Sequence, residues 1–156
     1  MQDNDNDMSG QTRIELLRRA HEARKTLGSM AEEDYIEVIY ELERVRGYAR
    51  PVDIASILGV KAASVTSMIK RLEKKNYIVY ERYRSVRLTE KGRELAQKIA
   101  RNHSFLLEFL ESLGVSREKA NIEAELLEHF LSEETISRLR QFYMECANRR
   151  ARSSES

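Results

Sequence analysis

The sequence predicts a mainly helical protein in which a winged helix-turn-helix domain is followed by an all-helical domain. Three observations support this fold class. Apolar residues recur at helical spacing through most of the chain. A short helix, a glycine-containing turn and a longer helix are followed by two short β segments, which is the order of elements in a winged helix. The remaining segments have helical periodicity only.

The composition is typical of a soluble helical protein. Of the 156 residues, 41% are hydrophobic and 34% are charged, and the chain has one Pro and six Gly. No run approaches the ~18 apolar residues of a membrane span, so we expect no membrane partner. The single cysteine, Cys146, cannot form an internal disulfide, which indicates a reducing cytoplasm.

The net charge of +1 conceals an uneven distribution of charge along the chain. Residues 46–101 carry 14 Lys and Arg against 5 Asp and Glu, whereas the segments on either side carry more acids than bases. A basic segment of this kind favours a polyanion such as DNA as the partner. The acidic flanks favour cations.

Four regions can be distinguished along the chain. Residues 1–29 are an N-terminal extension, with a disordered tail over 1–10, a short helix over 11–27 and a linker at Gly28 and Ser29. Residues 30–92 form the predicted winged helix, and residues 93–146 form the helical domain. Residues 147–156 are expected to be a loose C-terminal tail.

The first helix of the winged domain is predicted from Met30 to Arg46. Its buried stripe consists of Tyr35, Val38, Ile39, Leu42 and Val45. Asp34 and Glu37 lie three residues apart at the edge of that stripe. Asp34 can also be explained as an acid that complements the dipole of the first helical turn.

A helix-turn-helix follows, with a short helix from Pro51 to Leu58, a turn over residues 59–61 and a longer helix from Ala62 to Asn76. The longer helix buries Val65, Met68, Ile69 and Leu72. Small polar residues and cations on the opposite face suit a helix that lies in the major groove of DNA. The predicted DNA-contacting residues of this helix are Ala63, Ser64, Thr66, Ser67, Lys70, Arg71 and Lys74.

Two short strands, Ile78–Glu81 and Val86–Thr89, are predicted to form a hairpin directly after this helix. Such a hairpin is a wing, and Arg82 and Arg84 at its tip can contact phosphates or enter the minor groove. The alternative is that both arginines lie on a solvated turn.

A long helix is predicted from Thr89 to Leu113, and it carries more apolar residues than a single stripe requires. This excess suggests a subunit interface. The apolar residues are Leu95, Ile99, Leu106, Leu107, Phe109 and Leu110. His103 lies among them, and a single helical histidine is more often a packing residue than a ligand.

The next helix, capped by Ser116, carries Glu125, Glu128 and His129 at positions i, i+3 and i+4, which places them on one face. Ile122, Leu126, Phe130 and Leu131 cover the neighbouring arc. An ordinary amphipathic helix with a solvated acidic face would show the same pattern. Ser132 is expected to cap a last helix that ends near Met144.

Three predicted helices therefore offer four carboxylates and two imidazoles, and oxygen-rich mixed donors suit a divalent ion such as Mn(II) or Fe(II). Two such ions would balance the four carboxylates. Metal could then draw the first helix toward the C-terminal helices. The predicted metal ligands are Asp34, Glu37, His103, Glu125, Glu128 and His129.

Several motifs together resemble the DtxR/MntR family of metal-dependent transcriptional repressors. They are Gly47–Arg50, Asp53–Ala55, Ser64–Thr66, Tyr80–Arg84, Leu88–Gly92 and Glu125–His129. The resemblance implies a homodimeric winged-helix repressor that binds an operator in double-stranded DNA and controls manganese-uptake genes. It also implies that the six ligands hold a pair of Mn(II) ions. The iron-sensing branch of the family carries Met and Cys at the positions of Asp34 and Glu125, so the chain is more similar to the manganese branch.

Three alternatives remain at this point. The winged helix could respond to Fe(II), or it could respond to no metal. A carboxylate-bridged metal enzyme would typically carry Glu-x-x-His motifs, but Ala100 and Leu126 stand three residues before the two histidines. No nucleophile–base pair or phosphate-binding glycine loop is evident, so we expect no catalysis and no small organic ligand.

Overall fold

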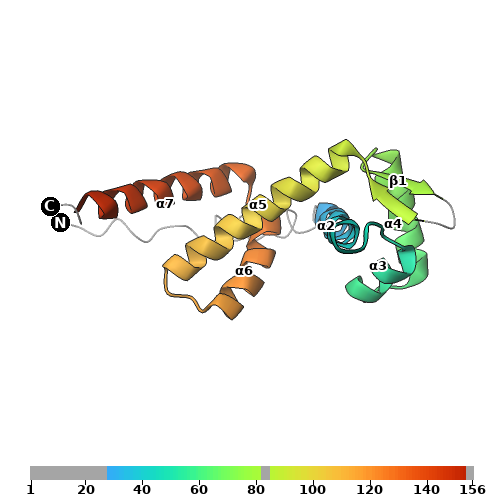
Figure 1. Ribbon diagram of the computed structural model, residues 1–156, viewed down its shortest axis with the longest axis horizontal. Helices are drawn as coiled ribbons and strands as arrows, with labels where there is room; N and C mark the ends of the chain where they lie inside the picture. The colour runs from blue at the N-terminus through green and yellow to red at the C-terminus, as the bar shows by residue number, and fades with distance from the viewer. Residues whose placement is uncertain (1–27, 82–84, 154–156) are drawn as a thin grey trace, which may run out of the picture.

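The computed structural model describes residues 28–81 and 85–153, which form helices and one two-stranded sheet. Figure 1 shows an elongated molecule in which one long helix, α5, joins the hairpin and helix-turn-helix at one end to the last two helices at the other. The mainly helical winged-helix architecture predicted from the sequence is confirmed. In order, the elements are α2 (Gly28–Arg46), α3 (Pro51–Leu58), α4 (Ala62–Lys74), β1 (Ile78–Glu81), β2 (Ser85–Leu88), α5 (Glu90–Ser112), α6 (Arg117–Phe130) and α7 (Glu133–Ser153).

Helix α2 lies at the centre of the winged-helix core. Its residues Ile36 and Ile39 are fully buried together with Ile54 of α3, Leu72 of α4 and Val86 of β2. Burial of such a side chain contributes about 1.5–3 kcal/mol, so these five residues fix the helix-turn-helix and the wing against α2. The helix-turn-helix and the wing are therefore packed directly on α2.

The wing is connected to both α2 and α5 by polar contacts. Strands β1 and β2 are antiparallel, with Ile78 opposite Leu88. Glu43 of α2 accepts a hydrogen bond from the backbone N–H of Leu88 and another from Arg93 of α5, both at 3.1 Å. Helix α5 starts where the Thr89 hydroxyl accepts from the N–H of Gly92 at 3.1 Å. The wing, α2 and the start of α5 are thus held together by these contacts.

A second core lies between α5, α6 and α7. It contains the buried residues Phe105, Leu106, Ala124 and Ile136. Phe105, Phe109 and Tyr143 form a cluster of aromatic rings with centroids about 6 Å apart, which is within the favourable range for such pairs. This core anchors α6 to the far half of α5, away from the wing.

Several boundaries differ from the sequence-based prediction. Helix α2 begins at Gly28, so Gly28 and Ser29 are not a linker and Asp34 is not in the first helical turn. Helix α7 continues to Ser153, well beyond Met144, so most of the expected loose tail is helical. The predicted disordered tail and extra helix within residues 1–27 lie outside the described residues. Ser132 does cap α7 by accepting from the N–H of Thr135, whereas Ser116 precedes α6 without a side-chain cap.

The expected distribution of apolar surface was partly wrong. Val45 is 70% exposed rather than buried. The apolar residues of α5 are at least partly buried within the chain: Leu95 packs against the winged-helix core, and Leu106, Leu107, Phe109 and Leu110 belong to the core shared with α6 and α7. Large apolar side chains are exposed instead on α6 and α7, at Ile122, Leu126, Phe130, Phe142 and Met144. The exposed apolar surface of this half of the chain therefore lies mainly on α6 and α7, and the subunit interface stays a prediction.

None of the described helices is by itself long and apolar enough to cross a membrane. The pair α3 and α4 passes that test together by length and composition, and the two helices meet at a bend of 114°.

Candidate metal centre

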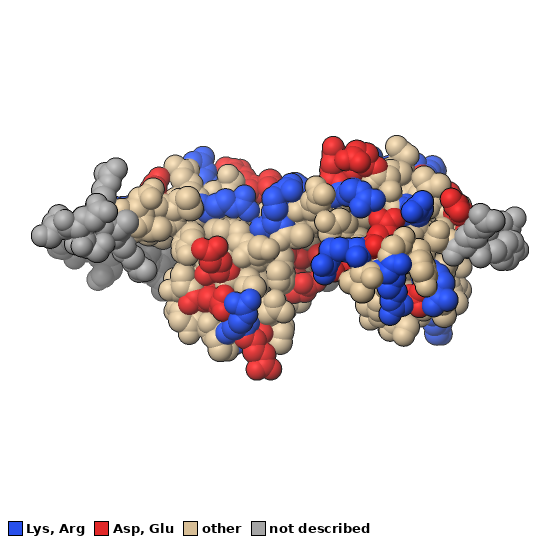
Figure 2. Space-filling view, in the orientation of Figure 1, with Lys and Arg blue, Asp and Glu red and all other residues tan. Residues whose placement is uncertain are grey.

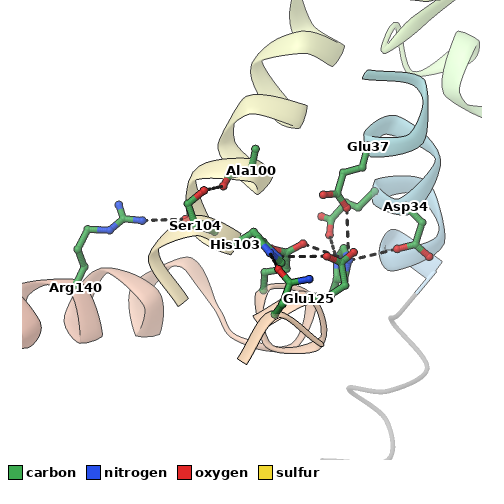
Figure 3. A network of polar contacts seen from close by, with 12 residues as sticks. Asp34, Glu37, Ala100, His103, Ser104, Glu125 and Arg140 are labelled. Atoms are coloured by element: carbon green, nitrogen blue, oxygen red, sulfur yellow. Dashed lines mark hydrogen bonds and ion pairs between the residues drawn. The ribbon is translucent and has the colours of Figure 1, made fainter. Parts of the chain in front are cut away.

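Three helices bring carboxylates and imidazoles to one place, close to the middle of the molecule. Helix α2 contributes Asp34 and Glu37, and α5 contributes His103, as Figure 3 shows. Helix α6 contributes the remaining residues of the cluster, and its spacing of three and four places them on the face that packs against α5.

The distances within this cluster are short. Glu37, Glu125, Glu128 and His129 each offer a ligand atom, and these four atoms lie within 4.8 Å of one another. His103 Nδ1 lies 3.3 Å from a carboxylate oxygen of Glu125 and 3.3 Å from one of Glu128.

Asp34 completes the set, because its Oδ1 lies 3.3 Å from His129 Nε2. The structure thus brings together all six residues that the sequence nominated as metal ligands. Their role as ligands stays a prediction.

The centre of the cluster is buried and lacks hydrogen-bond partners. The side chain of Glu128 is 1% exposed and that of His129 is 4% exposed. Within the described part of the chain, the buried polar side-chain atoms without a hydrogen bond are His103 Nδ1, both carboxylate oxygens of Glu128 and His129 Nε2. Buried polar atoms normally have partners. Four unpartnered nitrogen and oxygen atoms in one buried cluster fit a divalent cation.

The electrostatics of the cluster agree with this fit. Burial raises the pKa of Glu128 to about 8, and the carboxylates of Glu37 and Glu125 contribute to the rise. Burial also raises the pKa of Glu37 to about 7, with further contributions from neighbouring carboxylates. The pKa of Asp34 is raised by burial as well. Without a cation, these carboxylates retain protons because they cannot all be ionised side by side.

His129 has the opposite preference, because its charged form is favoured. A hydrogen bond to Glu33 raises the pKa of His129 to about 9, and the nearby carboxylates of Asp34, Glu128 and Glu37 add to the effect. Burial acts in the other direction but does not prevail. In the metal-free state a proton on His129 therefore supplies part of the positive charge that a cation would bring.

Two residues that sequence reasoning missed orient the histidines. His129 Nδ1 donates to Glu33 at 2.9 Å, and His103 Nε2 donates to the side-chain oxygen of Asn121 at 3.1 Å. These contacts select the tautomers that direct His129 Nε2 and His103 Nδ1 toward the centre. Glu33 lies four residues before Glu37, and Asn121 lies four residues before Glu125, so their helical spacing could have revealed both.

The predicted DNA-reading face is exposed. All seven residues nominated on α4 are solvent-exposed, while Val65, Ile69 and Leu72 on the other side are buried. Figure 2 shows Lys and Arg side chains gathered over the end of the molecule that holds α4 and the hairpin. Arg82 and Arg84 lie outside the described residues. This face of α4 is therefore exposed to solvent, as the face of a recognition helix must be, and Arg71 at its edge also donates to Glu32 at 2.7 Å.

Comparison with known proteins decides the family. Residues 29–86 match the family described as iron dependent repressor, N-terminal DNA binding domain, and residues 89–150 match the iron dependent repressor metal binding and dimerisation domain. The chain belongs to the iron-dependent repressor family, the DtxR/MntR family that the motifs resembled. It is a DNA-binding regulator by family and not an enzyme.

Curated relatives within this family are regulators called MntR. The chain is 47% identical over 107 residues to the HTH-type transcriptional regulator MntR of Geobacillus kaustophilus, and this match covers 69% of the chain and 76% of the relative. The MntR of Bacillus subtilis is 44% identical over 107 residues, with 69% and 75% coverage.

Solved structures of iron-dependent repressor family members agree in fold. The manganese regulator SloR matches with a TM-score of 0.61 and 32% identity over 72% of the chain. The repressor ScaR with bound Zn²⁺ matches with a TM-score of 0.63 and 31% identity, also over 72% of the chain. The chain spans 53% of the length of each of these two proteins.

The family boundaries show where the cluster lies. Asp34 and Glu37 belong to the region matched by the DNA-binding domain, whereas His103 and the three α6 residues belong to the region matched by the metal-binding and dimerisation domain. The cluster therefore joins the two functional parts of this family member.

Proposed function

We propose that the chain is a Mn(II)-activated repressor that binds operator DNA as a homodimer and controls manganese-uptake genes in the cytoplasm. The observation that carries this proposal is the position of the carboxylate–histidine cluster between α2 and α6. Residues 30–92 then act as the DNA-binding domain and residues 93–146 as the dimerisation and metal-binding domain.

The choice of Mn(II) rests on the donor atoms and on the relatives. The cluster offers carboxylate oxygens and imidazole nitrogens without a thiolate, and such donors suit a borderline-hard divalent ion. Cys146, the one thiol of the chain, is on α7 and is not among the cluster residues. The curated relatives carry the name MntR, and one solved relative is called a manganese regulator. Fe(II) remains the second candidate because it accepts the same donors.

We propose two ions per subunit, held by Asp34, Glu37, His103, Glu125, Glu128 and His129. Six ligand side chains exceed what one ion requires when water completes its coordination. Two divalent ions also match the charge of the four carboxylates once these have lost their protons.

The switch follows from the residues of the cluster. Mn(II), when bound, supplies the positive charge that allows neighbouring carboxylates to be ionised together. Glu37, in its ionised form, then holds α2 against Glu128 and His129 of α6. Without metal, Glu37 and Glu128 instead retain protons. Because Ile36 and Ile39 of α2 anchor the helix-turn-helix, holding α2 also holds α4. Each tenfold difference in metal affinity between the DNA-competent arrangement and the alternative shifts the equilibrium between them by about 1.4 kcal/mol. By linkage, DNA must strengthen metal binding by the same factor by which metal strengthens DNA binding.

Operator binding is assigned to the exposed face of α4. Lys70 and Lys74 would contact phosphates, while the small residues Ala63, Ser64 and Ser67 near the start of the helix allow close approach to base edges. Thr66 and Arg71 flank this face, and Arg82 and Arg84 of the wing tip are assigned to the backbone or minor groove. A symmetric dimer would present two such helices at a spacing set by the metal-binding halves.

An electrophoretic mobility shift with promoter DNA of a manganese-uptake gene tests the proposal across a manganese series, with and without chelator. The wild-type chain should bind the DNA much more tightly when Mn(II) is present. Glu37→Ala and His103→Ala should remain folded dimers whose DNA binding no longer responds to Mn(II). Glu41→Ala is the matched control for Glu37→Ala, because Glu41 lies on the same helix, is exposed and, among the described residues, pairs with Arg44 three positions later. Equal DNA binding with and without manganese would contradict the proposal, and a stronger response to Fe(II) would favour the second candidate.

A further inference from the structure

Another carboxylate of α2, that of Glu32, faces the recognition helix rather than the metal cluster. It is 7% exposed and is one of three buried polar or charged residues in the described part of the chain. Its carboxylate accepts from Arg71 Nε at 2.7 Å and from Lys75 Nζ at 2.7 and 2.9 Å. Arg71 belongs to the last turn of α4, and Lys75 is the residue that ends this helix. Two cations from the end of α4 thus hold one buried carboxylate on α2.

The same turn of α2 also contacts the metal cluster. Glu33 accepts from His129 Nδ1 at 2.9 Å, and Asp34 lies 3.3 Å from His129 Nε2. Three consecutive residues therefore point to two different helices: Glu32 to α4, and Glu33 and Asp34 to α6. This single turn is the place where the contacts of the metal centre and the contacts of the recognition helix meet.

Stability alone is a weak explanation for the Glu32 contacts. Removing a carboxylate from water is costly, and a buried ion pair often contributes no more than well-packed apolar residues would. What such a pair does supply is a directional restraint, since the carboxylate has both cations within hydrogen-bonding distance in one geometry. The apolar contacts of α2 with Ile69 and Leu72 are less directional and would tolerate small rotations of α4.

We propose that Glu32 is a positioning residue that fixes the orientation of α4 relative to the metal-binding turn of α2, and so transmits the metal-bound arrangement to the DNA-reading face. This role rests on the proposed metal-dependent binding of DNA. Glu32 is neither one of the proposed metal ligands nor one of the proposed DNA-contacting residues. Its contribution is to the coupling between the two sites.

The test is the ratio of DNA affinities with and without Mn(II), measured by fluorescence anisotropy on a labelled promoter duplex. Glu32→Gln keeps the size of the side chain and removes its charge. We expect this ratio to fall about fivefold or more, which is the lower end of typical coupling between sites. The affinity for Mn(II) without DNA, measured by calorimetry, should change by less than about twofold. Glu41→Gln, which removes an exposed acid of the same helix, should leave both quantities unchanged.

The possible outcomes separate the explanations. A purely structural role for Glu32 would weaken DNA binding equally with and without Mn(II), so an unchanged ratio would overturn the inference. If Glu32→Gln does not fold, Lys75→Gln decides, because Lys75 is half exposed and Arg71 remains to hold Glu32. This variant should lower the ratio in the same direction, and an unchanged ratio would again overturn the inference. A wild-type chain without any manganese response would instead overturn the proposed function itself.

Discussion

Binding of Mn(II) to the metal-free chain at pH 7 should release about two protons per subunit. The raised pKa values of the cluster determine this number. Glu128, with a pKa of about 8, holds about 0.9 of a proton at pH 7, and Glu37, with a pKa of about 7, holds about half of one. His129, with a pKa of about 9, holds nearly one. Ligation requires the deprotonated form of each group, so these protons must leave.

The number of released protons can be measured by titration calorimetry in several buffers at the same pH. The observed heat depends linearly on the ionisation enthalpy of the buffer, and the slope is the number of protons. Glu128→Gln should lower the number by about one in a variant that still binds metal. As the pH rises above 7, the wild-type value should decline because the groups deprotonate in the free protein, and it should be below about one proton at pH 9. A slope below about 0.5 protons at pH 7 would refute the assignment of these groups as ligands.

Four further predictions concern stability and binding. The metal-free chain should lose stability as pH rises from about 5 to about 9. The reason is that Glu37, Glu128 and His129 have higher pKa values in the folded state than in the unfolded state, so the folded state binds more protons. Thermal unfolding that showed rising stability over this range would contradict the electrostatic account. Glu33→Gln should weaken Mn(II) binding by about 10-fold or more, because the substitution weakens the contact that orients His129, and an unchanged calorimetric affinity would remove Glu33 from the site. Lys70→Ala should weaken promoter binding about tenfold and reduce its salt dependence while sparing Mn(II) affinity; unchanged DNA binding would move the reading surface elsewhere. Gly92→Ala should lower the free energy of unfolding by about 3 kcal/mol, because the added methyl group would collide with the backbone carbonyl of Tyr77, and an unchanged denaturant midpoint would contradict this.

Much of the metal centre could be predicted from the sequence because helical spacing determines which residues share a face. Glu125, Glu128 and His129 are neighbours on α6 by the geometry of the helix alone. Asp34 and Glu37 are neighbours on α2 for the same reason. The resemblance of several motifs to a known family then indicated which faces meet. The face of α4 that remains exposed was predicted by the same periodicity.

Other features depend on what covers each face, which periodicity does not reveal. Val45 continues the apolar stripe of α2, yet no other described element covers it, and it is exposed. The apolar residues of α5 suggested a subunit interface, but within one chain they pack partly against the winged-helix core and partly against α6 and α7. Glu32 looked like one acid among several, and its role becomes visible only because residues 39 and 43 positions later pack beside it.

The central claim is that ions bind between α2 and α6 and thereby hold the reading helices in place. Anomalous diffraction from crystals grown with Mn(II) tests it most directly. The claim predicts manganese peaks within bonding distance of Glu37 on one helix and of Glu128 and His129 on the other. Manganese bound only elsewhere, with these side chains directed apart, would contradict it.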